Sequence, residues 1–210
     1  MKALRFSPGK AAAAAFFVFS ATCAAQEAVK PGVKVDDRWV YKRTDRRMKP
    51  PSLVYEVRAT FVDARAIHTL LERQGGQRES DAVWTPEWNS VVAVDGGVVE
   101  LEKGLLQFPL RPGQRYPAAW DVRRPTFGAF HVRHEREVRV EGWEEIEVPA
   151  GRFRALKVHA EGRYQRIDKP VVAKASNTIW YVPRVKRWVK NVYQDAELEI
   201  VEELYFYKVQ

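Results

Sequence analysis

The chain has 210 residues, with 35 basic residues against 27 acidic ones and a formal net charge of +8 at pH 7. Three of the basic residues precede residue 26, so residues 26–210 carry a net charge of only +5, spread over segments of mixed sign. This modest excess does not indicate a nucleic-acid-binding protein, and the length suits one domain with a full hydrophobic core.

The amino terminus has the three parts of a bacterial export signal. A positive head with Lys2, Arg5 and Lys10 precedes an uncharged run over 11–25 that ends in small residues. This run is shorter than the roughly 20 apolar residues that a membrane-spanning helix needs. We therefore predict a cleavable signal peptide over 1–25, a periplasmic or secreted protein, and no transmembrane segment in the mature chain.

Cys23, the only cysteine, leaves an alternative open. As the first residue of a mature chain it would be lipidated and would anchor the protein to a membrane. Lipoprotein signals usually have Leu three residues before this cysteine and Gly or Ala immediately before it, whereas this chain has Ser20 and Thr22. We favour cleavage near Ala25, which leaves no cysteine in the mature chain and excludes disulfides and thiol chemistry.

From Arg38 onward the apolar residues recur with a period of two, which is typical of strands with one buried and one exposed face. Three runs carry this signal, and the residues that share the apolar parity are Tyr55, Val57, Ala59 and Phe61; Phe130, Val132, Val138 and Val140; and Leu198, Ile200, Leu204 and Phe206. In 153–160, Leu156, Val158 and Ala160 share a parity that no charge interrupts and are expected to face the core, whereas Phe153, Ala155, Lys157 and His159 are expected on the more polar face.

Turn residues separate these runs, as in Asp95-Gly96-Gly97 and Pro149-Ala150-Gly151, and indicate about ten strands joined by hairpins. Only 65–74 and 112–121 have patterns compatible with a short helix. We predict an all-β, mainly antiparallel fold, a single curved sheet or a partly open barrel with little helix. Residues 26–210 form one β-rich domain, of which 26–36 are polar and expected to be flexible.

No catalytic, cofactor-binding or metal-binding residue is assigned from the sequence, and no cofactor is expected. His131 and His134 have the spacing of a metal-binding pair, but residues three apart in a strand point to opposite faces. None of the serines after residue 25 lies in a nucleophile elbow. The neighbouring carboxylates Glu144-Glu145 and Glu202-Glu203 are predicted to be exposed charges at strand edges. The other histidines are His68 and His159, and the serines are Ser52, Ser80, Ser90 and Ser176.

Tryptophan is the more informative residue type. Most of the seven are expected in the core or packed at strand edges, and the rest could form a concave apolar or sugar-stacking surface. Basic residues flank several of them, as in 184–188, which is typical of a solvated strand face with lysine and arginine stems. The tryptophans are Trp39, Trp84, Trp88, Trp120, Trp143, Trp180 and Trp188.

Four segments follow a common pattern: DDRWVYKRTD (36–45), FPLRPGQRY (108–116), VPAGRFRALKV (148–158) and WYVPRVKRWVK (180–190). Together they resemble a bacterial family of exported proteins known as a domain of unknown function. The resemblance implies a β-rich envelope domain, with no known enzyme activity and no functional residues to carry over. The chain departs from the pattern at Lys186 and Arg187, where many relatives have Gly.

These observations favour a periplasmic, non-enzymatic protein that binds an apolar or amphipathic envelope ligand, such as a lipid, or an envelope protein. The alternative is a structural or assembly protein of the cell envelope, and a hydrolase is the third possibility. A deep apolar cavity would favour the ligand-binding protein and a filled core would favour the scaffold.

We expect the exported protein to be cleaved near Ala25 and to carry no lipid. The intact mass of protein recovered from the periplasm measures this directly. A mass increase the size of a diacylglycerol on Cys23 would make the protein a lipoprotein instead.

Overall fold

The computed structural model describes residues 26–45, 47, 49, 52–73, 77–93, 95–124 and 130–210. The predicted signal peptide and Cys23 lie outside the described residues. The strands of the described part are β1 (Arg38–Asp45), β2 (Ser52–Val62), β3 (Ile67–Arg73), β4 (Gln77–Trp84), β5 (Ser90–Val92), β6 (Val98–Lys103), β7 (Arg115–Arg124), β8 (Phe130–Val148), β9 (Gly151–Arg166), β10 (Val172–Val182), β11 (Arg187–Asp195) and β12 (Glu199–Lys208), with a 3₁₀ turn, η2 (Pro183–Val185), between β10 and β11.

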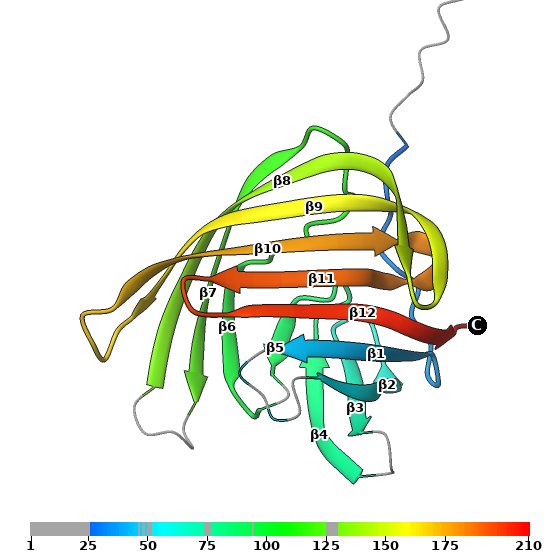
Figure 1. The fold of residues 1–210 in the computed structure, drawn as a ribbon, viewed down its shortest axis with the longest axis horizontal. Coiled ribbons are helices and arrows are strands. Elements are labelled where there is room, and N and C mark those ends of the chain that lie inside the picture. Colours follow the sequence, from blue (N-terminus) through cyan, green and yellow to red (C-terminus); the bar gives the residue numbers. More distant parts are fainter. Residues whose placement is uncertain are drawn as a thin grey trace, which may run out of the picture.

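The strands form a closed antiparallel barrel in which each strand pairs with its neighbours in the sequence (Figure 1). The all-β, antiparallel prediction is confirmed. The predicted single sheet or partly open barrel is wrong, because β1 pairs with β12 from Arg38↔Lys208 to Asp45↔Ile200. This pairing satisfies the backbone groups that two edge strands would leave free, and closure is how a large antiparallel sheet removes its edges.

The two segments compatible with a short helix are strands. Residues 65–74 contain β3 and residues 112–121 contain most of β7. Each strand is bonded on both sides, β3 to β2 and β4, and β7 to β6 and β8. Pairing with two neighbours outweighs a weak local helical pattern, because local propensity is only a weak prior on secondary structure.

Alternation predicts the buried face correctly until a strand contains a bulge. Val57 and Ala59 are buried as expected, whereas Phe61 is 51% exposed and Phe206 is 56% exposed. In β2 the pairing runs from Ala59↔Thr69 to Phe61↔His68, and in β12 it runs from Leu204↔Tyr41 to Phe206↔Val40. One extra residue in each strand therefore turns the following phenylalanine to the outside.

One end of the barrel is closed by loops that are bonded to one another. The Asn89 side chain exchanges two hydrogen bonds with the backbone of Leu106, at 2.8 and 2.9 Å, which joins the β4–β5 loop to the β6–β7 loop. Segment 26–36, for which we predicted flexibility, lies against this end: Ala28 exchanges two 2.9 Å backbone hydrogen bonds with Leu110. Asp37 follows as a fully buried carboxylate that accepts hydrogen bonds from Lys186 Nζ and from the backbone of Gln210.

The β8–β9 hairpin curls past the end of β10 toward β12 (Figure 1). It turns at Pro149-Ala150, with Gly151 at a φ of +120° as the turn requires. The Ala150 N–H donates to the Leu204 carbonyl of β12 at 3.0 Å, and the Phe153 ring lies 6.1 Å from the Tyr207 ring. This packing buries Phe153 and also Ala155, which alternation had placed on the polar face of the strand.

The inner face of β9 supplies a stability prediction. Leu156, Val158 and Ala160 are all buried, as alternation predicted, and Leu156 is fully inaccessible to solvent. We expect Leu156→Ala to lower the free energy of unfolding by about 2–5 kcal/mol, because it leaves a cavity in the core. His159→Ala on the other face loses one side-chain hydrogen bond with Thr178 and is expected to cost less. Urea unfolding measures both, and a Leu156→Ala effect below about 1 kcal/mol would contradict the assigned core face.

Candidate functional site

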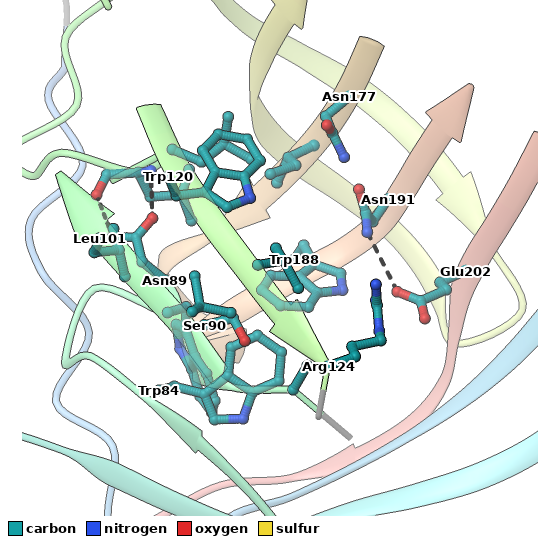
Figure 2. Close-up of a pocket in the computed structure, with 17 residues that line it drawn as sticks. Trp84, Asn89, Ser90, Leu101, Trp120, Arg124, Asn177, Trp188, Asn191 and Glu202 are labelled. Carbon is teal, nitrogen blue, oxygen red and sulfur yellow. Dashed lines mark hydrogen bonds between the residues drawn. The ribbon is translucent and has the colours of Figure 1, made fainter. Parts of the chain in front are cut away.

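The interior of the barrel contains a cavity of about 290 Å³. Four indole rings line it: Trp84 from β4, Trp88 from the β4–β5 loop, Trp120 from β7 and Trp188 from β11 (Figure 2). The remaining lining residues, mostly aliphatic or polar, are Asn89, Ser90, Ala93, Val99, Leu101, Leu105, Leu106, Val122, Arg124, Asn177, Ile179, Asn191 and Glu202.

Trp39, Trp84, Trp88 and Trp188 form one aromatic cluster in the interior. Trp39 is fully buried, and the rings of Trp84, Trp88 and Trp188 contact one another edge-on, with centroids 5.8–6.2 Å apart. This is a preferred geometry for aromatic pairs. The sequence predicted tryptophans in the core and a possible concave apolar surface, but their individual places depend on strand order.

Arg187 is the residue that sequence reasoning missed. The segment 184–188 indicated a solvated strand face, yet Arg187 is only 3% exposed. Its guanidinium carbon lies 4.3 Å from the ring centroids of Trp88 and Trp188, and within 5.5 Å of three more rings. A cation over aromatic faces is attracted by their quadrupoles, most strongly where water is excluded. The only signal in the sequence was the arginine directly before Trp188.

A carboxylate on β12 faces the same interior. Glu202 was predicted to be an exposed charge, but its side chain lines the cavity and is only 14% exposed. It accepts a 2.7 Å hydrogen bond from the Tyr55 hydroxyl and one of 3.3 Å from Asn191 Nδ2. Burial raises the pKa of the Tyr55 hydroxyl well above its usual range, so that this hydroxyl remains a donor. The neighbouring Glu203 lies on the other face and pairs with Lys190.

Three polar atoms of cavity-lining residues are buried without a hydrogen-bond partner in the described part of the chain: Ser90 Oγ, Trp188 Nε1 and Asn191 Oδ1. The indole N–H groups of Trp84 and Trp88 do have partners, Thr69 Oγ1 at 3.0 Å and the Lys186 carbonyl at 2.7 Å. Buried polar groups are nearly always paired, so unpaired ones in a cavity identify where a ligand can bond.

His131 and His134 lie on opposite faces of β8, as the spacing argument predicted. His131 Nε2 lies 2.8 Å from an Asp121 carboxylate oxygen on the outer face, and His134 stacks on the Trp120 ring in the interior with centroids 4.9 Å apart. Burial, reinforced by the positive charges of Arg136 and Arg124, lowers the pKa of His134 to about 3. His134 is therefore neutral at physiological pH.

The described residues contain neither a cluster of metal-binding side chains nor a membrane-spanning helix. They contain no group of three or more His, Cys, Asp or Glu side chains placed to hold a metal ion. No helix among them is long and apolar enough to cross a membrane.

No family model and no curated protein matches the chain, so the resemblance to the exported family stays a prediction. A structure from Bacteroides fragilis NCTC 9343, described as "a putative exported protein with YmcC-like fold", is 14% identical with a TM-score of 0.51, covering 86% of this chain and 99% of that one. "A putative lipoprotein" from Parabacteroides distasonis ATCC 8503 is also 14% identical, with a TM-score of 0.48 and the same coverage. The first similarity shows a shared barrel fold.

The neutral His134 predicts a specific pH dependence of stability. Its pKa is about 3 in the folded protein and about 6.5 when exposed. Between these values the unfolded chain binds the proton and the folded chain does not, so the free energy of unfolding falls as pH falls below about 6.5. This residue contributes at most about 1.4 kcal/mol per pH unit.

We expect His134→Phe, which keeps the ring on Trp120, to lose less stability between pH 7.5 and pH 5 than the wild type. Urea unfolding at the two pH values measures the difference, and His68→Phe on the exposed face of β3 is the control. Equal losses in the wild type and His134→Phe would show that His134 is not held neutral by burial.

Proposed function

We propose that this chain is an exported, non-enzymatic protein of the cell envelope that binds an apolar or amphipathic ligand inside its barrel. The observation that carries the proposal is the cavity of about 290 Å³, lined by four indole rings and by aliphatic side chains from β6, β7 and β10. Concave, mostly apolar sites with a few polar groups are the usual form of small-molecule sites.

The cavity supports ligand binding over a purely structural role. Protein interiors are normally packed as closely as organic crystals, and a void in the core lowers stability. A scaffold gains nothing from such a void. A protein that binds a ligand needs it, and rigid indole walls provide large contact area at a small entropic cost.

Export is supported by two independent observations. The first is the predicted signal peptide over 1–25. The second is the shared fold with the Bacteroides fragilis protein, which is described as "a putative exported protein".

The absence of enzymatic activity is supported by the polar groups around the cavity. Ser90 is the serine that lines it, and its Oγ has no hydrogen-bond partner among the described residues, so no base holds it as a nucleophile. His134 is in the interior, but it stacks on Trp120 and is not a cavity-lining residue.

A matched pair of substitutions on β6 tests the proposal. Val99 lines the cavity and is 8% exposed, whereas its neighbour Val98 is 43% exposed on the outer face. We expect Val99→Phe to occupy cavity space and weaken binding of the neutral fluorescent probe N-phenyl-1-naphthylamine by about tenfold or more, which is about 1.4 kcal/mol. Val98→Phe adds the same ring outside and should leave binding unchanged.

Fluorescence titration of the mature protein measures both variants, after thermal unfolding has shown that each is folded. Native mass spectrometry of protein from its own periplasm would add the identity of a copurified ligand. If the wild type does not bind the probe, or if both variants bind it as the wild type does, the cavity is not a binding site.

A further inference from the structure

We propose that the cavity selects ligands whose apolar body carries an uncharged head group able both to accept and to donate a hydrogen bond, a hydroxyl or a carboxamide. The head group lies between Trp188 Nε1 and Asn191 Oδ1. This inference rests on the proposed function and specifies the ligand class for the same cavity.

A bulge in β11 brings the two side chains to the same face. Trp188 and Asn191 are three residues apart, so regular alternation would place them on opposite sides of the sheet. The pairing with β10 runs from Tyr181↔Trp188 to Trp180↔Lys190, which leaves Val189 as an extra residue. Both Trp188 and Asn191 therefore line the cavity, and bulges of this kind commonly re-aim side chains at functional sites.

Trp188 offers a hydrogen-bond donor that the protein itself does not use. The residue is 7% exposed, and its Nε1–H has no acceptor in the described part of the chain. The other buried indoles of this cluster are satisfied: Trp39 Nε1 donates to the Val185 carbonyl at 2.8 Å, and Trp84 and Trp88 have the partners given above. An indole nitrogen can only donate, so the ligand must supply an acceptor.

Asn191 offers an acceptor whose orientation is determined by its neighbours. Glu202 Oε2 can only accept, so the Asn191 atom 3.3 Å from it is the amide nitrogen, Nδ2. The Tyr55 hydroxyl donates to the other oxygen of Glu202 and holds that carboxylate in place. The amide oxygen, Oδ1, is left buried with no donor among the described residues, so the ligand must supply one.

The two requirements exclude charged head groups. A carboxylate has no hydrogen to donate to Asn191 Oδ1 and would lie near the Glu202 carboxylate. The Arg124 guanidinium that also lines the cavity is paired with Asp95, and Arg43 is paired with Glu202. An ammonium has no lone pair with which to accept from Trp188. A hydroxyl or a carboxamide meets both requirements. Figure 2 shows the Trp188 nitrogen and the Asn191 amide on the same side of the cavity as Glu202, while Leu101 lies across from them.

The test compares five probes with the same ten-carbon chain: decane, 1-decanol, decanamide, decanoate and decylammonium. Their dissociation constants for the mature protein are measured at pH 7.5 by displacement of N-phenyl-1-naphthylamine. We expect decanol and decanamide to bind about tenfold more tightly than decanoate and decylammonium. Equal affinities of the neutral and charged probes would overturn the inference.

Two substitutions that replace an indole by a phenyl ring separate the proposed contact from general packing. Trp188→Phe should reduce the advantage of decanol over decane by about five- to tenfold, the worth of one hydrogen bond. Trp84→Phe trims the same cavity wall and can weaken the binding of both probes, but it removes an N–H that the protein already satisfies through Thr69. The ratio of the decanol and decane affinities should therefore be unchanged. An unchanged advantage in a folded Trp188→Phe would overturn the inference.

Glu202→Gln provides a second route should Trp188→Phe not fold. It removes the negative charge and allows the Asn191 amide to turn, so binding of decanoate should improve relative to decanol. No change in this ratio would contradict the role of Glu202 in orienting Asn191.

The failure of this inference differs from failure of the proposed function. If all five probes bind with similar affinity and Val99→Phe blocks them, the cavity binds ligands without selecting the head group. If none binds, both the cavity proposal and the head-group inference fall.

Discussion

The closed end of the barrel depends on one guanidinium enclosed by indole rings. Arg187 begins β11 directly after the β10–β11 turn, and the rings around it come from β1, β4, the β4–β5 loop and β11 itself. Two of those indoles, Trp39 and Trp88, also donate hydrogen bonds to the Val185 and Lys186 carbonyls of the turn. Strands distant in the sequence are thereby joined around one cation.

Lys186 occupies the left-handed position of this turn and extends its contacts. It adopts a φ of +61°, a conformation in which Gly is the usual residue, and its Nζ lies 2.9 Å from the fully buried Asp37 carboxylate. Asp37 in turn accepts from the backbone of Gln210, so the turn, the start of β1 and the carboxyl terminus meet at one carboxylate. Lys186 and Arg187 thus both have structural roles in this chain.

The buried cation also shapes the cavity. Trp188 contacts Arg187 through its ring, while its N–H has no acceptor among the residues that the structure describes. Glu202 places a negative charge in the same interior, where it accepts hydrogen bonds from Tyr55 and Asn191. This side of the cavity is therefore polar, and buried polar groups in an apolar interior strongly prefer to be paired. The other side, with Leu101, Leu105 and Leu106, is apolar. An amphipathic ligand matches that division.

The sequence by itself determined the all-β class and most of the buried face. Alternation correctly predicted the inward side of β9 at Leu156, Val158 and Ala160. It also predicted the opposite faces of His131 and His134, because the period of two is a property of the extended backbone. The tryptophan content indicated an aromatic core with a possible concave surface, without assigning residues to it.

Only the tertiary structure decided closure and the site. Closure requires pairing between β1 and β12, which are the most distant strands in the sequence, and no local pattern encodes that contact. The bulges that turn Phe61 outward and bring Trp188 and Asn191 together depend on the register between neighbouring strands. Arg187 and Glu202 looked like surface charges in the sequence, because burial of a charge depends on partners that the folded barrel alone brings near.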